Sequence, residues 1–390
     1  MIVAWAAFIV SLLLIAYTFL GYPLLLVFWA KLAPHPVSRG TYEPRVAIVV
    51  VVHNGELLIR QKIDSCLSQN YCKDRLRILI VSDGSNDGTC EIVRSYANEV
   101  ITLLAMDERR GKAGCLNDAV SACDEEVLIF TDVRQALHPN AVSRLVDNFL
   151  DANVGAASGR LVFDREGITD FGESLDAYWR YEKFVRQLES AIHSSVGVTG
   201  AIYALRRNNF REIPLDTVLD DVLIPMNVVT QGMRVIFEKQ ALAFDRPSQF
   251  AAQERTRKIR TLAGNFQLIL KNPRFLLPWR NPIALQFISH KLMRLLVPVA
   301  LVGAFISNAF LIDEGLFYVV TQIMQIAAYA MAACGVFWKR AEQFLLVKLA
   351  MGFFSLNWFV VLGFLEFLSN RNAHLWKADR TVSNEPSSST

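Results

Sequence analysis

Four long stretches without a charged side chain constrain the fold of this chain more than any other feature. They cover Met1–Ala30, Leu295–Ile312, Gly315–Trp338 and Leu349–Leu365. An α-helix needs about 20 consecutive apolar residues to cross a bilayer. The first stretch is longer than the apolar core of a cleaved signal peptide and lacks its basic start. We therefore expect a retained transmembrane anchor at 1–30, followed later by three more spans.

The charged residues between the apolar stretches predict the arrangement around the membrane. We expect an amphipathic interfacial helix at 283–294, three transmembrane helices within 295–368 and a tail at 371–390. Basic residues follow the first span, whereas the acidic pair Asp313-Glu314 joins the second and third. Because basic residues favour the cytoplasmic side, the globular part is expected in the cytoplasm of a multi-pass cell-membrane protein. The side of the tail stays open, because its basic residues favour the inside while four spans place it outside.

Composition excludes two classes of partner or site. The formal net charge of +3 is too small to indicate a nucleic-acid partner. The six cysteines include no C-x-x-C pair and no zinc spacing. We interpret them as reduced packing residues of an intracellular compartment.

Between about 45 and 270, apolar runs rich in β-branched residues alternate with segments of helical periodicity. Strands are expected at Arg45–Val52, Leu76–Val81 and Glu126–Thr131, with helices after the first and before the third. This alternation predicts an α/β fold with a parallel, Rossmann-like sheet. Beyond residue 153 the pattern predicts shorter edge strands, at Val154 and at Leu161–Phe163, separated by small residues.

Polar residues follow three of these strands at the point where each strand ends. His53 and Glu56 follow the first, Asp83 follows the second and Asp132 ends the third. In open α/β sheets the carboxyl edge binds ligands, and a carboxylate there can hold a divalent cation and a diphosphate. Taken singly, each of these residues is more often a turn or helix-cap residue than a ligand.

Three further groups of residues suggest chemistry. Lys112 follows Gly111 at a helix start, where a lysine can contact phosphate or lie in solvent. The pair Asp220-Asp221 begins a helix, so one acid can cap it while the other serves as a general base. Basic residues within 255–260 form a cluster that could cover a leaving diphosphate or face lipid headgroups.

Seven motifs in order along the chain resemble the membrane-bound family 2 glycosyltransferases. The motifs are Val46–Glu56, Ser82–Thr89, Gly111–Asn117, Phe130–Gln135, Thr199–Ala204, Leu219–Asp221 and Arg257–Arg260. The resemblance covers most of the chain, and its strength lies in the order of motifs that are individually weak. It implies a GT-A domain at 45–270, a nucleotide-sugar donor, a divalent cation (Mg²⁺ or Mn²⁺) and a saccharide or glycolipid acceptor at the bilayer.

The resemblance also implies a role for individual residues. Those implied to hold the donor are His53, Glu56, Asp83, Lys112 and Asp132, of which Asp132 is also the metal ligand. Gly200 is implied to line the acceptor site and Asp221 to be the catalytic base. The residues implied to bind the diphosphate are Arg257, Lys258 and Arg260.

The sequence departs from the family pattern at several positions. Gly55 replaces a frequent Glu, Arg134 replaces the second acid of the D-x-D motif, and Asp220 stands where Glu is usual. No Trp follows Arg260, so the Q-x-x-R-W signature of processive synthases is absent. A processive synthase that exports its polymer, and a catalytically inactive nucleotide-binding membrane protein, remain the alternatives to non-processive inverting transfer.

Arg134 leads to a specific hypothesis about metal dependence. If the strand stays extended past Asp132, Arg134 faces the same side as that carboxylate. A guanidinium binds phosphate oxygens in pairs and stays charged at all physiological pH values. We therefore expect Arg134 to contact the donor diphosphate and to make transfer only partly dependent on the cation.

Overall fold

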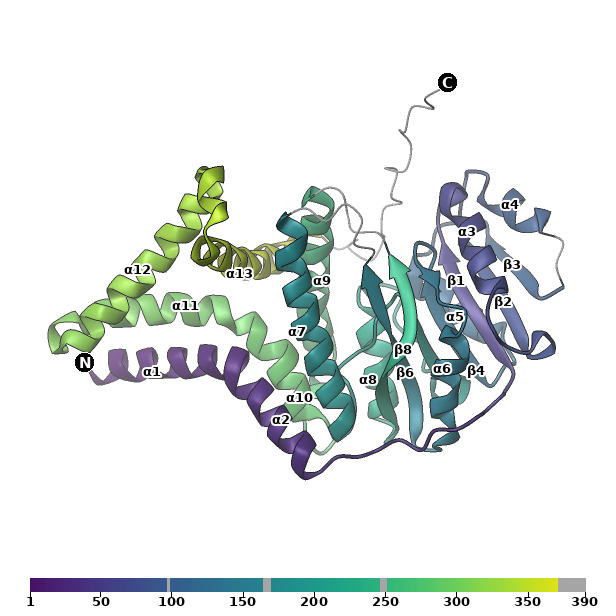
Figure 1. Cartoon of the computed structure of the whole chain (residues 1–390), viewed down its shortest axis with the longest axis horizontal. Helices are drawn as coiled ribbons and strands as arrows, with labels where there is room; N and C mark the ends of the chain where they lie inside the picture. Colours follow the sequence, from purple (N-terminus) through teal and green to yellow (C-terminus); the bar gives the residue numbers. More distant parts are fainter. Residues whose placement is uncertain (97–98, 164–169, 246–250, 371–390) are drawn as a thin grey trace, which may run out of the picture. The chain divides into compact units, whose positions relative to one another are not determined.

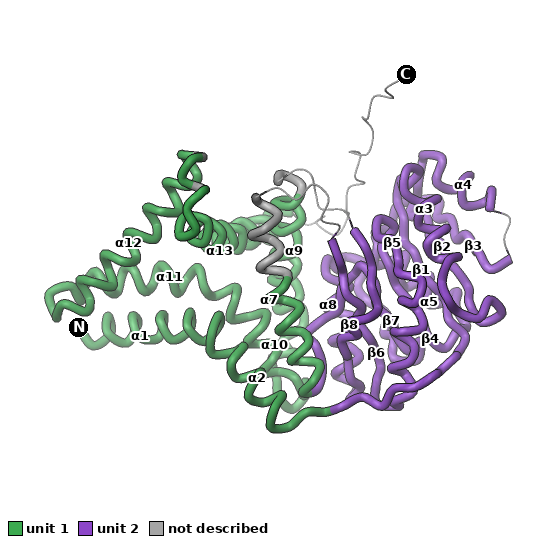
Figure 2. The backbone as a smooth tube through the Cα atoms, viewed as in Figure 1, with its two compact units in different colours: residues 1–35, 165–192, 247–370 green, residues 36–164, 193–246, 371–390 purple. Residues whose placement is uncertain are grey.

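The computed structural model describes residues 1–96, 99–163, 170–245 and 251–370. The chain divides into two compact units, each assembled from separate segments of sequence (Figure 2). Unit 1 contains the N-terminal helices, α7 (Asp170–Ile192) and the helices from α9 (Ala251–Lys271) onward. Unit 2 contains the sheet. A continuous globular domain was expected from 45 to 270, but α7 and α9 within that range belong to unit 1.

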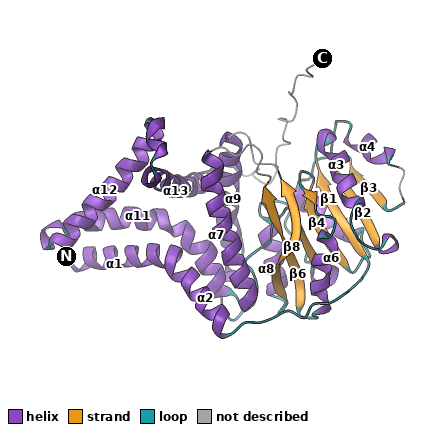
Figure 3. Ribbon diagram, viewed as in Figure 1, coloured by secondary structure: helices purple, strands orange, loops and turns teal. Residues whose placement is uncertain are grey.

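Unit 2 is built on one eight-stranded mixed sheet (Figures 1 and 3). Its strand order is β3-β2-β1-β4-β7-β6-β8-β5. The first four strands in that order are parallel, as the alternation of strands and helices predicted. The strands are β1 Val46–Val52, β2 Leu76–Asp83, β3 Ile101–Met106, β4 Val127–Asp132, β5 Ala136–Leu137, β6 Val154–Phe163, β7 Tyr203–Arg206 and β8 Arg234–Asp245.

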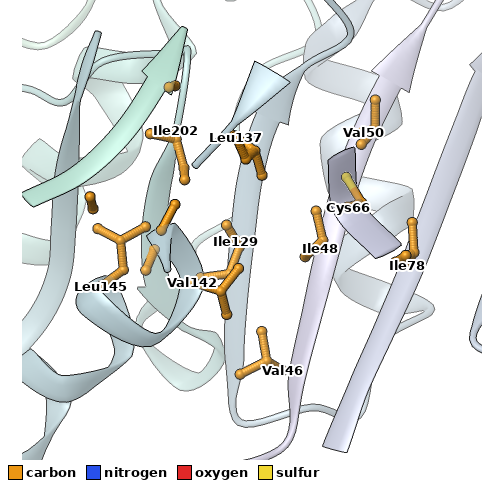
Figure 4. Close-up of a cluster of buried hydrophobic side chains, with 14 of the residues drawn as sticks. Val46, Ile48, Val50, Cys66, Ile78, Ile129, Leu137, Val142, Leu145 and Ile202 are labelled. Atoms are coloured by element: carbon orange, nitrogen blue, oxygen red, sulfur yellow. The ribbon is translucent and has the colours of Figure 1, made fainter. Parts of the chain in front are cut away.

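Helices bury both faces of the parallel half, which explains the continuous apolar runs of β1 and β4. Alternate residues of β1, including Ile48 and Val50, join one core cluster with Cys66 of α3 and Val142 of α6 (Figure 4). Helix α5 packs against β1 and β2 with residues outside that cluster. The helices of this unit are α3 Glu56–Leu67, α4 Thr89–Ser95, α5 Lys112–Ser121, α6 Ala141–Val146 and α8 Asp220–Val229.

The strands after residue 153 differ from the expectation of short separate pieces. β6 runs without a break from Val154 to Phe163, although its middle, Gly155–Gly159, consists of small residues with weak strand preference. The ladders with β7 and β8 supply the hydrogen bonds that hold it extended. The prediction of two strands was therefore wrong. The short strand β5 and helix α6 were not predicted.

Unit 1 is helical, and four helical segments among its described residues are long and apolar enough to cross a membrane. These segments are Ile2–Leu32, Ala284–Ala309, Leu316–Phe337 and Leu345–Ser369. The first comprises α1 (Ile2–Ala16), a π-helical turn and α2 (Tyr22–Leu32). The second comprises α10 (Ala284–Phe287), a π-helical turn at Ile288–Leu292 and α11 (Met293–Ala309). The last two are α12 and α13.

The expected interfacial helix at 283–294 is continuous with a span in the structure, because no break separates α10 from α11. The π-helical turn between them buries His290, which is 1% exposed. Its Nδ1 lies 2.7 Å from Oε1 of Glu189, and its Nε2 lies 2.8 Å from Oε1 of Glu182. Arg294 donates to the other oxygen of Glu182 at 2.8 Å, and Tyr22 donates to Glu189. We call these five residues the unit 1 charge cluster.

Candidate active site

The carboxyl ends of three neighbouring parallel strands place polar groups at one edge of the sheet. In the ladders Val52 of β1 lies opposite Ser82, next to Asp83, and Val51 lies opposite Asp132. His53, Asp83 and Asp132 therefore share this edge, as the sequence predicted. Ligands of open α/β sheets bind at such edges.

The antiparallel strand β7 brings a fourth segment to the same edge. Tyr203 begins β7 opposite Phe130 near the end of β4, so the residues just before Tyr203 lie at the carboxyl edge. Among them is Gly200. A Cβ atom built on Gly200 would lie 3.4 Å from Oδ2 of Asp132, 3.9 Å from Nζ of Lys112 and 4.0 Å from Oδ2 of Asp221. Three residues predicted from separate motifs therefore converge on one glycine.

Lys112 lies between two carboxylates, those of Asp132 and Asp220. Its ammonium lies 3.0 Å from Oδ1 of Asp132 and 3.1 Å from Oδ2 of Asp220. Burial alone would lower the pKa of Lys112, but Asp132 and Asp220 outweigh burial and raise the pKa. The lysine is therefore charged at neutral pH, and it neutralises two carboxylates that would otherwise repel each other.

Helix α8 presents the acid pair in its first turn, where the helix dipole stabilises carboxylates. Asp220 is 6% exposed and paired with Lys112, whereas Asp221 is half-buried and lies beside Gly200. Pro225 lies inside the helix rather than in its first turn. Proline has no N–H group, so residue 225 cannot donate the usual helical hydrogen bond to the carbonyl of Asp221. The N–H of Val198 donates to that carbonyl instead, at 2.9 Å. This bond ties the acid pair to the segment that carries Gly200.

Asp83 is fully buried, and its carboxylate binds the loop that precedes α5. Oδ1 accepts from the main-chain N–H of Arg110 at 2.6 Å, and both oxygens accept from the N–H of Gly111 at 3.1–3.2 Å. Gly111 has φ +81°, a conformation that favours glycine. Asp83 therefore positions the start of α5, including Lys112. Direct contact between Asp83 and a nucleotide stays a prediction.

His53 and Glu56 connect the loops that follow β1 and β2. Nδ1 of His53 lies 2.7 Å from the carbonyl oxygen of Asp83. Oε2 of Glu56 accepts from the N–H of Gly88 at 3.3 Å, and its own N–H donates to Asp87. These contacts hold the edge loops together, and donor binding by His53 and Glu56 stays a prediction.

Arg134 does not follow the expected geometry. The strand β4 ends at Asp132 and a turn follows, so the premise of an extended chain to Arg134 was wrong. The guanidinium pairs with Asp245 at the end of β8, a carboxylate that is only 1% exposed. Gln135 donates to the same carboxylate oxygen of Asp245 at 2.8 Å.

The basic residues Arg257, Lys258 and Arg260 lie on α9 in unit 1. Burial lowers the pKa of Lys258, and Glu254 partly offsets this effect. Their action on a diphosphate stays a prediction.

Two buried residues beneath the edge were missed by sequence reasoning. Lys62 of α3 donates to Thr131 and to the carbonyl of Gln135, on either side of Asp132. Its position in the buried stripe formed by Ile59, Ile63 and Cys66 was the available signal. Tyr203 stacks on Phe130, and its buried hydroxyl has no hydrogen-bond partner among the described residues. Burial and then Asp220, Asp221 and Asp132 raise the pKa of Tyr203.

The donor set at this edge fits a divalent cation that is shared with a ligand. Asp132 has a side chain that is 43% exposed, and it shares the ammonium of Lys112 with a second carboxylate, Asp220. Mg²⁺ and similar cations in phosphate-binding sites use one or two carboxylates together with phosphate oxygens. Within the described ranges no three acid, histidine or cysteine side chains converge, so a protein-only metal cage is not seen there.

Comparison with known proteins gives curated relatives that match part of this chain. The chain is 28% identical over 123 residues to the probable glycosyltransferase YdaM of Bacillus subtilis. The matched region covers 30% of this chain and 29% of YdaM. It is 17% identical over 233 residues to the poly-beta-1,6-N-acetyl-D-glucosamine synthase of Staphylococcus aureus. The matched region covers 58% of this chain and 56% of the synthase. The chain thus spans less than two thirds of either relative.

A solved structure and two family profiles extend the comparison. Mannosyltransferase PcManGT from Pyrobaculum calidifontis, in complex with GDP-Man and Mn²⁺, aligns with a TM-score of 0.68 at 23% identity, over 93% of this chain and 99% of that one. This likeness confirms the GT-A-like fold with apolar helices. The profile of glycosyl transferase family 2 matches residues 47–213, and that of glycosyl transferase family group 2 matches 132–364, more than half of the chain. The chain therefore belongs to glycosyl transferase family 2, as the order of its motifs predicted.

Proposed function

We propose that this protein transfers a glycosyl group from a nucleotide sugar to a saccharide or glycolipid acceptor, with inversion at the anomeric carbon. The observation that carries the proposal is the convergence on Gly200. A carboxylate suited to a metal, a charged lysine and a second carboxylate lie within 4.0 Å of the Cβ position that this glycine leaves empty. A donor diphosphate and an acceptor hydroxyl need these three kinds of group within reach of one point.

Asp221 is the base in this mechanism. The acceptor oxygen attacks the anomeric carbon, the bond from that carbon to the diphosphate oxygen breaks, and the acceptor proton moves to the carboxylate of Asp221. Asp220 is unsuited to the role, because it is buried and already paired with Lys112. A single displacement of this kind inverts the anomeric configuration.

Lys112 stabilises the negative charge that develops on the leaving nucleoside diphosphate. When ligand binds, its ammonium can exchange a carboxylate partner for a phosphate oxygen at the same edge. A divalent cation bound through Asp132 would supply further positive charge to the same phosphates. We assign Arg257, Lys258 and Arg260 to the same diphosphate as a cationic cover, and His53, Glu56 and Asp83 to the nucleotide.

We place the reaction at the cytoplasmic face of the cell membrane, where nucleotide sugars are available. Charge asymmetry around the apolar stretches supports this orientation. A cysteine introduced at Glu314 should then react with a membrane-impermeant thiol reagent on intact cells, above the labelling of the parent chain. A cysteine at Asn86 should stay unlabelled, and the opposite pattern would invert the orientation.

A processive synthase is the second candidate, and the likeness to the Staphylococcus aureus synthase favours it. Thr261, where a processive enzyme carries Trp, argues against it. The length of the product distinguishes the two, because a non-processive enzyme adds a single sugar to each acceptor that it binds. A protein that binds nucleotide without transfer or hydrolysis would instead match the inactive alternative.

The experiment is a screen of detergent-purified protein against nucleotide sugars, with release of nucleoside diphosphate as the readout. GDP-mannose is the first donor to test, because the similar Pyrobaculum structure holds it, and UDP-N-acetylglucosamine is the second. We expect release with one donor that increases when membrane lipid extract is added as acceptor. Binding without release from any donor would contradict the proposal.

A further inference from the structure

Lys62 is a charged residue in the hydrophobic core of unit 2. Helix α3 places it on the buried face with Ile59, Ile63 and Cys66, and it is 1% exposed. Within the described part of the chain, its hydrogen-bond partners are neutral oxygens, and no carboxylate pairs with it directly. Burying an ammonium in this way is costly, and an apolar side chain of the same length would avoid the cost. Packing alone therefore does not explain a lysine here.

The contacts of Lys62 surround the turn that carries Asp132. Its Nζ donates to Oγ1 of Thr131 at 2.6 Å and to the carbonyl oxygen of Gln135 at 2.7 Å. These two residues flank the segment 132–134. One ammonium thus fixes both ends of the turn at the carboxyl edge.

The same contacts reach the glycine at the centre of the site. Oγ1 of Thr131, which accepts from Lys62, donates to the carbonyl oxygen of Ala201 at 2.7 Å. Ala201 follows Gly200, beside which Asp132 and Asp221 lie. A chain of two hydrogen bonds therefore connects Lys62 with the strand end of Asp132 and with the backbone beside Gly200.

The electrostatic surroundings of Lys62 point in the same direction. Burial lowers its pKa to about 8, and Cys66, Asp132 and Asp245 act against this lowering. The ammonium is therefore mostly charged at neutral pH, beneath an edge where carboxylates and a donor diphosphate concentrate negative charge. A low dielectric around the site strengthens this attraction.

We propose that Lys62 is a positioning residue of the donor site, which holds the Asp132 turn in place from below and supplies a fixed positive charge beneath the diphosphate and its cation. The proposal rests on the proposed function, because it assumes that a nucleoside diphosphate binds at this edge. It differs from a purely structural role in one respect. Replacing a lysine with a purely structural role would lower both the stability of the protein and its affinity for nucleotide. Replacing Lys62 should lower the affinity alone.

The test compares Lys62→Met, which removes the charge and the donors, with Lys62→Gln, which keeps a donor. Lys73→Met is the matched control, because Lys73 is exposed in the same unit. Binding of GDP and UDP, each with Mn²⁺, is measured by calorimetry, Mn²⁺ affinity by electron paramagnetic resonance, and the melting temperature in parallel. We expect Lys62→Met to weaken nucleotide and Mn²⁺ binding by about tenfold or more without a lower melting temperature. Lys62→Gln should weaken binding less, and Lys73→Met should bind as wild type.

Two outcomes overturn the proposal while leaving the proposed function intact. One is wild-type nucleotide and Mn²⁺ affinity in Lys62→Met. The other is a loss of binding that follows a loss of folding in both Lys62 variants, which would make Lys62 a structural residue only. If wild-type protein binds neither nucleotide, the proposed function fails and this inference fails with it.

Discussion

The two compact units both bury ionisable side chains, but they satisfy them differently. In the unit 1 charge cluster, Glu182 is 4% exposed and Glu189 is fully buried, and both are bound by His290. At the carboxyl edge of unit 2, Asp132 keeps a side chain that is 43% exposed, although Lys112 binds it. A carboxylate surrounded by protein donors serves structure, whereas one left open on one side can exchange a partner for a ligand.

The partners of the buried ionisable groups also differ between the two units. Both ring nitrogens of His290 lie within hydrogen-bond distance of carboxylate oxygens, those of Glu182 and Glu189. Arg294 and Tyr22 donate to the same two carboxylates, so each carboxylate has at least two protein partners. Among the described residues of unit 2, the ammonium of Lys62 is bound by neutral oxygens only. The comparison predicts that substitutions at the edge of unit 2 reduce function, whereas those in the unit 1 charge cluster reduce stability.

The largest effect is expected from Asp221→Asn. Loss of the general base should lower the rate of transfer about 10²–10⁴-fold while donor affinity stays nearly unchanged. Asp220→Asn is the matched comparison, and it should weaken donor binding through Lys112. If Asp220→Asn abolishes transfer while Asp221→Asn stays active, the assignment of the base is wrong.

Glu182→Ala should have the opposite profile. It leaves His290 and Arg294 without a shared carboxylate, and breaking a buried ion pair costs about 3–5 kcal/mol of stability. We expect a clear fall in the melting temperature in detergent, with donor affinity unchanged below that temperature. Glu314→Ala, at an exposed acid of the same unit, is the control. Unchanged stability in Glu182→Ala would remove the distinction between the two units.

The pH dependence of stability should also differ between the units. Lys62 has a folded-state pKa of about 8, below the ordinary value of 10.5, so the unfolded chain binds more protons between these values. Its contribution to stability therefore rises by up to about 3 kcal/mol as the pH increases from about 8 to 10.5. Lys62→Met should lack this rise in denaturant titrations, and an identical rise in both proteins would contradict the prediction.

In unit 1 stability also rises with pH, but it does so in the acidic range. Burial would raise the pKa of Glu182, but His290 and Arg294 lower it well below the ordinary value. The stability that Glu182 contributes is therefore present above its ordinary pKa and is lost as the pH falls through the lower, folded-state pKa. Glu182→Gln should reduce this acid sensitivity.

The smallest effect is expected from Arg134→Ala. Because the guanidinium pairs with Asp245, its removal leaves that buried carboxylate with the Gln135 donor and should cost about 1–3 kcal/mol of stability. Transfer should depend on the divalent cation equally in both proteins. Transfer that survives in chelator and disappears in Arg134→Ala would instead support the contact with diphosphate inferred from the sequence.

Local patterns predicted the parts of the fold and site that depend on neighbours in sequence. The apolar runs of β1, β2 and β4 gave the parallel half of the sheet, and the polar residues after them gave the edge, including Asp83 and Asp132. The placement of Gly200 followed from the family resemblance. The structure then showed that Asp132, Lys112 and Asp221 meet beside it.

The features that sequence reasoning missed depend on contacts between distant segments. Asp245 binds Arg134 across 111 positions, and Glu182 meets His290 across 108. The strand β6 is continuous because its neighbours pair with it, despite the small residues in its middle. Lys62 was overlooked because a lysine in a helix is usually exposed, and only its spacing from Ile59 and Ile63 marked it as buried.

The central claim is that the carboxyl edge of unit 2 binds a nucleoside diphosphate with a divalent cation through Asp132. Calorimetric titration of GDP and of UDP, each with Mn²⁺, into wild-type protein and into Asp132→Asn tests it most directly. The account predicts that wild type binds one of the two nucleotides and that Asp132→Asn binds it roughly 10–100-fold more weakly, with an unchanged melting temperature. Equal affinity in the two proteins would contradict the account.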